Sequence, residues 1–560
     1  MSDLQIARSV TLKHIFEVAQ TLGIHSEDLI PFGRYKAKVT ANLETRLNAR
    51  PIGRYVLVTA INPTPLGEGK TTTSIGLSMG LCRLGHRSVV TLRQPSLGPV
   101  FGIKGGGTGG GRAQVCPMED INLHFTGDAH AVSSSHNLLS AFVDNHLFHG
   151  NALKLDPNGI MWPRTLGVSD RALRNVIIGA EPDRRLGQFV ITEASEVMGL
   201  LALATDHADL RQRLGRILVG LKASGELAKA EAFGCAGSMA VLLKDALLPN
   251  LVQTLEGTPA FVHAGPFGNI AHGNCSIVSD RLALRCADYV VTEAGFGSDL
   301  GAEKFFNIKC RTSGLRPDVG VVVATLRALK LHGGGGVAKA GASLPVGLTG
   351  PNQSALEKGF ANLEQHIANV RAHGVPVVVA VNAFSDDSSD ELNWVCERAK
   401  AAGAEAAAVS THWADGGRGA EELARVVVKV AAQGAQFKHL YDVAWPIKKK
   451  IETIATTMYG AAGVSFLPQA ERDIELATRM GFDDLPICMA KTPLSLSHDP
   501  ALKGRPFGFT VPIQQLRILA GAGFLTAVCS GIQLMPGLPK RPAGERIDMD
   551  PQSGEIVGLA

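Results

Sequence analysis

Residues 55–92 read YVLVTAINPTPLGEGKTTTSIGLSMGLCRLGHRSVVTL, and their pattern decides the fold class. The apolar run at 55–61 predicts a buried strand, residues 71–84 follow a helical pattern, and residues 88–92 are again rich in β-branched side chains. A strand, a crossover helix and a second strand at this spacing form a βαβ unit, whose strands run parallel. We therefore predict an α/β fold.

The turn of this unit carries Thr64-Pro-Leu-Gly-Glu-Gly-Lys-Thr-Thr72, which is typical of a P-loop. Its glycines let successive N–H groups face a phosphate, Lys70 neutralises phosphate oxygens, and the Thr71 hydroxyl is a ligand for Mg²⁺. One departure is Thr64, which stands where the usual pattern has its first glycine. The predicted nucleotide-binding residues are Pro65, Leu66, Gly67, Glu68, Gly69, Lys70, Thr71 and Thr72.

Further apolar runs continue the same pattern along the chain. They lie at 175–178, 260–263, 289–292, 319–324, 375–381 and 406–409. Most of them alternate with segments of helix length, which predicts a doubly wound, mostly parallel sheet with helices on both faces, as in P-loop NTPases. Ahead of this region, apolar residues three or four apart predict amphipathic helices at 8–23 and 27–49.

The chain has 560 residues, enough for three or four domain-sized units. A stretch rich in Gly, Ala and Pro at 333–351 indicates a loop or linker, the pattern changes after about residue 459, and 547–558 (IDMDPQSGEIVG) indicates a hairpin. We predict a large N-terminal nucleotide-binding domain at 1–365 and two smaller α/β domains, at 366–460 and 461–560.

Composition excludes several classes of protein. With 45% hydrophobic residues, 19% charged residues and a net charge of +4, the chain is neither disordered, nor a coiled coil, nor a dedicated nucleic-acid binder. Its nine cysteines include no C-x-x-C pair, which favours a reducing compartment, and we expect a cytoplasmic protein. No run of about 18 apolar residues and no signal-peptide pattern occurs, so we expect no membrane association.

Candidate site residues follow the second strand. Arg93 comes directly after it and should face the same crevice as the P-loop, where its planar fork can hold a carboxylate and a phosphate together. Seven glycines in residues 102–111 indicate a backbone that lines an anion site, although a flexible linker is the alternative. Asp120, His124, Asp128 and His130 then form a titratable cluster suited to metal binding or proton transfer, or else a solvated loop.

Seven segments resemble those of one enzyme family, the formate–tetrahydrofolate ligases. They are TPLGEGKTT, RQPSLGPVFGIKGG, DINLHFTGD, HAGPFGNIAHG, VTEAGFGSDLGAEKF, VATLRALKLHGG and MPGLPK. These segments span most of the chain, from about residue 8 to its C-terminus. The length of the chain suits the monofunctional prokaryotic form of the enzyme. The resemblance implies ATP-dependent ligation of formate to tetrahydrofolate through formyl phosphate, which yields 10-formyltetrahydrofolate, ADP and phosphate in one-carbon metabolism.

The resemblance also implies roles for individual residues. Lys70 and Arg93 match the cations that hold the phosphates and formyl phosphate, and Asp128 matches an acidic residue near the folate amine. Phe384 and Trp413 match the aromatic side chains on either side of the pterin, within the predicted domain 366–460. The family pattern further implies Mg²⁺ with ATP, activation by a monovalent cation (K⁺ or NH₄⁺) and a homotetramer.

Some residues differ from the family pattern, and the residues alone leave other functions open. Gln94 replaces a glutamate, Thr108 an alanine and Arg112 a tyrosine. The lost carboxylate at 94 and the gained Arg112 make the pocket more cationic. A strand, a P-loop and a helix are shared with NTPase switches, so such a switch is one alternative. A ligase for another small carboxylate and a non-enzymatic nucleotide-binding scaffold are the others.

Overall fold

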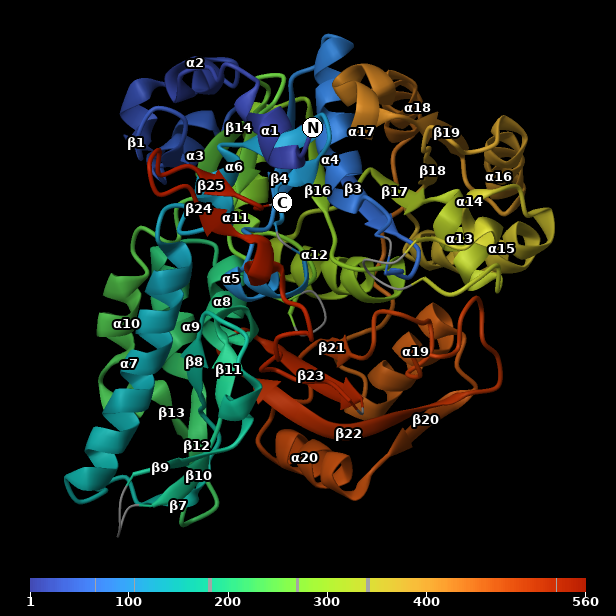
Figure 1. Ribbon diagram of the computed structural model, residues 1–560. Helices are drawn as coiled ribbons and strands as arrows, with labels where there is room; N and C mark the ends of the chain where they lie inside the picture. Colours follow the sequence, from blue (N-terminus) through green and yellow to red (C-terminus); the bar gives the residue numbers. More distant parts are fainter. Residues whose placement is uncertain are drawn as a thin grey trace.

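The computed structural model describes residues 1–65, 67–104, 106–179, 184–267, 271–338, 343–529 and 531–559. Its largest sheet contains seven parallel strands at the centre of the upper half of Figure 1. In spatial order they are β15 (Pro259–Val262), β4 (Ser88–Leu92), β16 (Tyr289–Glu293), β3 (Arg54–Ala60), β17 (Val319–Ala324), β18 (Val377–Asn382) and β19 (Ala406–Ser410). The predicted strands 55–61, 88–92, 260–263, 289–292, 319–324, 375–381 and 406–409 are thereby confirmed.

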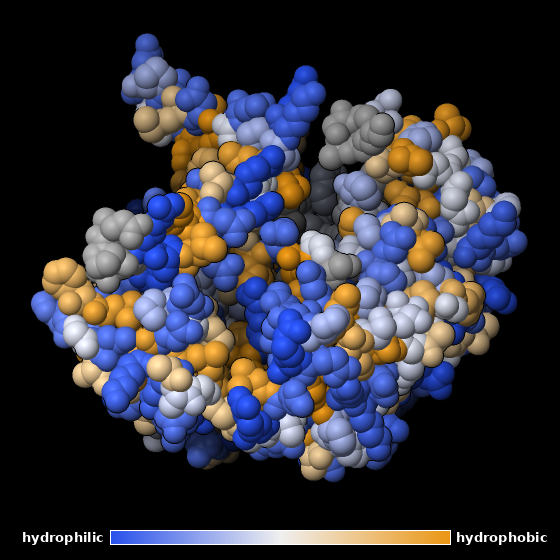
Figure 2. Space-filling model, turned by 90° about the horizontal axis from the view of Figure 1, so that it is seen from below, coloured by the Kyte–Doolittle hydropathy of each residue, from blue (hydrophilic) through white to orange (hydrophobic). Residues whose placement is uncertain are grey.

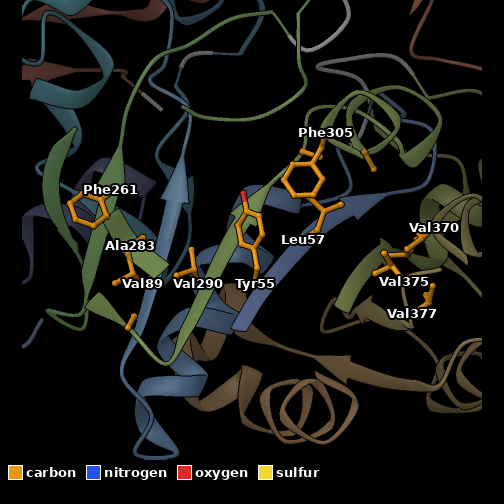
Figure 3. Close-up of a cluster of buried hydrophobic side chains, with 14 of the residues drawn as sticks. Tyr55, Leu57, Val89, Phe261, Ala283, Val290, Phe305, Val370, Val375 and Val377 are labelled. Atoms are coloured by element: carbon orange, nitrogen blue, oxygen red, sulfur yellow. The ribbon is translucent and has the colours of Figure 1, made fainter. Parts of the chain in front are cut away.

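Helices cover both faces of this sheet. One face carries α4 (Lys70–Arg83) and α18 (Glu421–Ala431), and the other carries α11 (Ile277–Cys286), α15 (Gln353–Ala372) and α16 (Ser389–Ala401). Because successive side chains of a strand point to opposite faces, Tyr55 and Leu57 enter one core while Val56 and Val58 enter the other. Figure 3 shows the first of these cores, with Phe305 beside Tyr55. The mixed α/β fold with a large, mostly parallel sheet is confirmed.

Two of the expected elements were wrong. Residues 27–49 form a hairpin of β1 (Leu29–Pro31) and β2 (Ala37–Val39) and the short helix α3 (Asn42–Leu47), because Pro31 lacks a backbone N–H and Gly33 adopts a φ of +86°. Within 8–23 only α2 (Ile15–Gln20) is helical beyond the end of α1 (Asp3–Arg8). The β2 strand pairs with the antiparallel strand β14 (Asn250–Thr254), and so extends the sheet beyond β15.

The apolar run at 175–178 was also misassigned to the large sheet. It forms β9 (Val176–Ile178), which pairs antiparallel with β10 (Arg185–Gly187) in a separate two-stranded ribbon. Ile177 is 57% exposed, so this run lies on the surface and is not a buried strand. Periodicity over so few residues does not distinguish the two cases.

Between β4 and β14 the chain inserts a second packed unit, at the lower left of Figure 1. Its long helix α7 (Asp128–Phe148) packs with α8 (Glu196–Leu203), α9 (His207–Arg216) and α10 (Ala236–Leu242) around a buried apolar core. A small sheet joins β7 (Leu155–Ile160), β12 (Leu218–Lys222) and β13 (Leu227–Lys229). We call residues 128–248 the insertion.

The C-terminal part of the chain has a sheet and a core of its own. Its strand order is β20 (Gly463–Phe466), β22 (Thr510–Leu519), β23 (Phe524–Cys529) and β21 (Ile487–Ala490), and α19 (Ile447–Tyr459) and α20 (Pro468–Arg479) pack on it. The strands of 366–460, by contrast, continue the large sheet. The predicted boundaries at 365 and 460 stay predictions.

The expected hairpin near the C-terminus is present as β24 (Asp548–Met549) and β25 (Ile556–Val557). It returns to the first helix, where Arg8 donates a hydrogen bond to the carbonyl oxygen of Ile556 at 2.9 Å. Seen from below, the molecule is hydrophilic over much of its rim, and hydrophobic residues lie around a hollow near the middle of that face (Figure 2). Within the described ranges, no helix is both long enough and apolar enough to cross a bilayer.

Candidate active site

The P-loop, residues 64–72, leads directly into the N-terminus of α4. Gly67 and Gly69 adopt φ values of +73° and +75°, the left-handed region that glycine enters without strain. A Cβ on Gly69 would lie 2.9 Å from the amide nitrogen of Asn382, so this position also lacks room for a side chain. Lys70 is the first residue of the helix, where unpaired N–H groups and the helix dipole favour an anion. Leu66 lies outside the described residues.

Other side chains hold this loop in shape. The buried Glu68 carboxylate accepts a hydrogen bond from the N–H of Thr64 at 2.7 Å, and burial raises the pKa of Glu68 although Lys70 opposes the shift. The Asn382 amide donates to the carbonyl oxygen of Glu68 and to the Thr73 hydroxyl, both at 2.9 Å. The side chain of Glu68 therefore closes the loop, and Pro65 lies exposed beside it.

Arg93, Glu293 and Lys70 follow or end three neighbouring parallel strands, β4, β16 and β3. The carboxyl ends of these strands lie at one edge of the sheet, which is where ligands bind in open α/β sheets. The Thr71 hydroxyl donates to the Glu293 carboxylate at 2.9 Å. Glu293 was missed from the sequence, although an acidic residue at the end of the apolar run 289–292 was an available signal.

The Arg93 guanidinium lies between two loops at this edge. It donates to the carbonyl oxygen of Pro266 at 3.2 Å, beyond β15. A Cβ on Gly295, beyond β16, would lie 2.8 Å from its Nη2 atom. A glycine at 295 therefore leaves space for the guanidinium. Gln94 is buried beside it, and its N–H donates to the carbonyl oxygen of Ala264 at 2.7 Å.

Asp128 is the first residue of α7 and is buried in an ion pair. Its carboxylate lies 2.8 Å from the Nζ of Lys38, and the side chains are 3% and 1% exposed. It also accepts from the Asn250 amide at 2.8 Å and from the Thr126 hydroxyl at 3.3 Å. Two of these three donors cannot be read from the sequence, because Lys38 and Asn250 come from distant strands, β2 and β14. This pairing gives Asp128 a structural role in addition to the predicted catalytic one.

The two aromatic candidates follow the neighbouring strands β18 and β19. Phe384 is 41% exposed and Trp413, in the short helix α17 (His412–Asp415), is 56% exposed. The loop of Trp413 contacts the P-loop helix, because His412 lies within hydrogen-bonding distance, 3.1 Å, of the Thr72 hydroxyl. The guanidinium of Arg327 lies 3.8 Å from the ring centre of Phe384. Both rings therefore lie at the same edge of the sheet as Lys70.

The glycine tract is an ordered support for Trp413. Its last residues form β5 (Gly109–Gly110) and pair with β6 (Ala113–Cys116). A Cβ on Gly111 would lie 2.8 Å from the indole ring, and the Arg112 N–H donates to the carbonyl oxygen of Trp413 at 2.8 Å. The role of the glycine tract in anion binding stays a prediction. Gly105 lies outside the described residues.

The remaining members of the titratable cluster lie at the surface. Asp120 forms an ion pair with Lys36 at 2.7 Å, and His124 and His130 are exposed. In the part of the chain that the structure describes, no three His, Cys, Asp or Glu side chains converge as a metal centre would require.

Comparison with known proteins identifies the family. The model of the family "Formate--tetrahydrofolate ligase" matches residues 1–560. The chain belongs to this family. It is 52% identical over 563 residues to the formate–tetrahydrofolate ligase of Saccharopolyspora erythraea, covering 100% of this chain and 99% of that protein. It is 51% identical over 564 residues to that of Roseiflexus sp., covering 100% of both chains.

Formate–tetrahydrofolate ligase 1 of Rubrobacter xylanophilus is similarly close, at 51% identity over 573 residues, with 100% of this chain and 99% of that protein covered. The predicted resemblance is therefore confirmed over the full length of the chain. Its activity is that of the family, an ATP-dependent ligation of formate to tetrahydrofolate in one-carbon metabolism. The P-loop at the sheet edge is consistent with the use of ATP.

Proposed function

We propose that the P-loop and Arg93 hold ATP and formate in one crevice, and that the ligation passes through formyl phosphate. A carboxylate oxygen of formate attacks the γ-phosphorus, and the bond from that phosphorus to ADP breaks. The amine N10 of tetrahydrofolate then attacks the formyl carbon and gives up its proton, phosphate leaves and takes up that proton, and 10-formyltetrahydrofolate results. The observation that carries this proposal is that Lys70 and Arg93 follow strands separated only by β16. The sheet thereby supports a P-loop NTPase-like doubly wound fold.

Two cations are needed because formate itself offers little binding energy. It has three heavy atoms, so at about −1.5 kcal/mol per atom its dissociation constant cannot fall much below about 1 mM. Charge and planarity are its only distinctive features, and the guanidinium of Arg93 matches both. Phosphoryl transfer depends mainly on positioning and on neutralising the phosphate oxygens, which we assign to Lys70, Arg93 and the N–H groups of the P-loop.

Thr71 and Glu293 fit the Mg²⁺ ion that accompanies ATP. A hydroxyl and a carboxylate are hard oxygen donors, and the 2.9 Å hydrogen bond between them brings both oxygens to the start of α4. When bound, Mg²⁺ would neutralise charge on the phosphates. The two side chains orient each other at the phosphate-binding end of the loop.

Changing Glu293 to glutamine is expected to raise the Mg²⁺ concentration for half-maximal activity at least tenfold. The amide keeps the shape and an acceptor for Thr71 but removes the negative charge that attracts the cation. Activity measured across a Mg²⁺ titration checks this. Glu475→Gln, on the exposed side of α20, is the control and should leave the titration unchanged. An unaltered Mg²⁺ requirement in Glu293→Gln would remove Glu293 from the metal site.

We propose that Phe384 and Trp413 bind the pterin ring of tetrahydrofolate. Both rings are exposed, follow adjacent strands, and belong to loops that touch the P-loop through Asn382 and His412. Such contacts support a folate site next to the phosphates. Because formyl phosphate hydrolyses readily, the amine must be held beside it with water excluded. Holding two reactants side by side can lower a barrier by about 7–11 kcal/mol.

Replacing either aromatic residue with alanine is expected to raise the KM for tetrahydrofolate about 5- to 100-fold, since stacking a base on an aromatic side chain is worth about 1–3 kcal/mol. The KM values for ATP and formate should change little. Initial rates with each substrate varied in turn test this. Phe148→Ala removes a more exposed ring at the far end of α7 and serves as the control. Equal KM values for tetrahydrofolate in all variants would contradict the stacking role.

Isotope transfer tests the intermediate. With formate labelled with ¹⁸O, ATP and tetrahydrofolate, one labelled oxygen should appear in the released phosphate, because that oxygen bridges carbon and phosphorus in formyl phosphate. Unlabelled phosphate would contradict the proposed route. ADP release without formate would instead favour a switch-like NTPase, and release with other small acids would favour a broader carboxylate ligase.

Several expectations stay proposals that rest on the family. These are activation by K⁺ or NH₄⁺, assembly into a homotetramer, and a cytoplasmic location. All nine cysteines are free thiols, which is compatible with a reducing compartment. Activity in the presence of different monovalent salts and light scattering of the purified protein would test the first two.

A further inference from the structure

A second cavity lies between the insertion and the C-terminal sheet. Its volume is about 370 Å³, within the range of small-molecule sites. One wall is formed by β22, β23 and α20, and the other by residues 161–163, β11 (Phe189–Ile191) and the start of α8. None of the residues assigned to the P-loop crevice lines it. No step of the reaction described above involves this cavity.

Arg517 is the notable side chain of the cavity. It lies on β22, is partly buried, and in the described part of the chain its guanidinium makes neither a hydrogen bond nor an ion pair. Burial lowers the pKa of Arg517, against the opposing charge of Asp473. Removing a guanidinium from water is costly unless hydrogen-bond acceptors replace the water. Arg517 is therefore suited to an anion that enters the cavity.

A second donor lies next to Arg517. In the register of β22 and β23, Thr526 is directly opposite Arg517, and its buried hydroxyl has no hydrogen-bond partner among the described residues. The thiol of Cys488, opposite Thr526 on β21, donates to the carbonyl oxygen of Ala271 at 3.4 Å, and burial raises its pKa to about 11, so that it stays neutral. A buried hydroxyl without a hydrogen-bond partner is uncommon in folded proteins. An N–H and an O–H side by side match the two oxygens of a carboxylate.

The two carboxylates of the cavity already have partners. Asp473 accepts from the N–H of Leu516 at 3.0 Å, and Glu196 accepts from the N–H of Gly521 at 2.8 Å. Burial raises the pKa of Glu196 to about 7, which weakens its repulsion of an anion at neutral pH. The cavity thus has one cation whose charge is not neutralised by a direct ion pair.

The opposite wall is aromatic and apolar. Trp162 stacks on His136 with ring centres 4.1 Å apart, and Met161 and Val190 lie beside them. Both ring nitrogens of His136 are engaged, with the Ser195 hydroxyl at 2.7 Å and the Pro163 carbonyl at 2.9 Å. Burial lowers the pKa of His136 to about 4, so the ring is neutral. This wall suits a flat apolar body rather than a second charge.

We propose that this cavity binds an aromatic monocarboxylate, with the carboxylate on Arg517 and Thr526 and the ring against Trp162. The occupant is a free aromatic acid. The proposal does not depend on the route of the ligation.

Phenylacetate is the probe, with binding to the full-length protein measured by calorimetry and ligand-observed NMR. We expect a dissociation constant of about 0.1–1 mM, as for other ligands of this size. Phenylacetamide, which has the same shape without the charge, should bind at least tenfold more weakly. Phenylacetate binding should survive saturating tetrahydrofolate, and displacement by tetrahydrofolate would contradict a site for a free acid.

Arg517→Met should weaken binding of phenylacetate at least tenfold, while Arg479→Met, at the exposed end of α20, should leave it unchanged. Thr526→Val, which keeps the side-chain shape, should weaken binding by a smaller factor and provides a second test if Arg517→Met fails to fold. Ligation activity of both cavity variants without probe should match that of the unaltered protein. No binding of phenylacetate at 10 mM (roughly the weakest interaction of interest), or equal affinity in the unaltered and the Thr526→Val and Arg517→Met proteins, would overturn the proposal.

Discussion

Replacing Arg93 with alanine is expected to lower kcat by about 10³-fold or more while the affinity for ATP changes little. In the proposed mechanism the guanidinium neutralises charge that develops during phosphoryl transfer, and a single arginine in that position is worth about 10³–10⁵ in turnover. The proposed nucleotide-binding residues of the P-loop, with Lys70, belong to a different strand and helix and would hold ATP without it. Steady-state rates and nucleotide binding by calorimetry, measured on the same preparation, check both parts.

Arg87→Ala is the matched control for this variant. Arg87 precedes the same strand at its other end, is 55% exposed, and pairs with Asp288 on the surface. Its loss should leave kcat within about twofold, because exposed ion pairs contribute about 0–1 kcal/mol. Near-normal turnover in Arg93→Ala would show that the proposed crevice is not the site of phosphoryl transfer.

The second large effect concerns stability. Asp128→Asn is expected to lower the free energy of unfolding by about 3–5 kcal/mol, because it leaves the charge of Lys38 buried without a partner. Denaturant unfolding followed by tryptophan fluorescence measures the change. Asp120→Asn is the control. The Asp120 side chain, which pairs with Lys36, is 48% exposed, so this ion pair should contribute about 0–1 kcal/mol.

A double variant separates the structural from the catalytic role of Asp128. Lys38→Met combined with Asp128→Leu replaces the buried pair by apolar side chains and should recover most of the lost stability. If this folded protein is inactive, the carboxylate serves the reaction. If it is active, Asp128 serves only to hold α7 to β2. An Asp128→Asn protein as stable as the original would contradict the buried-pair argument itself.

The P-loop and the strands on either side of it were predictable because their signals are local. A buried strand, a glycine turn and a helix follow one another within residues 55–84, so neighbouring residues determine the outcome. Arg93 was placed correctly at the sheet edge for the same reason. The roles of Phe384 and Trp413 came from the family resemblance, since an aromatic residue after a strand more often packs in a core.

Pairing between distant segments was not predictable. Nothing near Lys38 indicates that it meets Asp128, which is 90 residues away. The segment 27–49 has helical spacing of its apolar residues. Its strand β2 nevertheless pairs with β14, which supplies hydrogen-bond partners for the backbone of β2. Glu293 was missed because its function depends on β16 lying beside β3, a neighbour relation that periodicity does not contain.

The position of β16 between β3 and β4 has a consequence for synthesis. The two strands of the first βαβ unit emerge early from the ribosome, but the strand that joins them is completed about 200 residues later. At about 5–20 residues per second, the unit waits about 10–40 s with strand edges that lack their neighbour. A nascent chain in this interval exposes strand edges that can pair with other chains, and the sheet edge beside the P-loop is completed only when residue 293 has been translated.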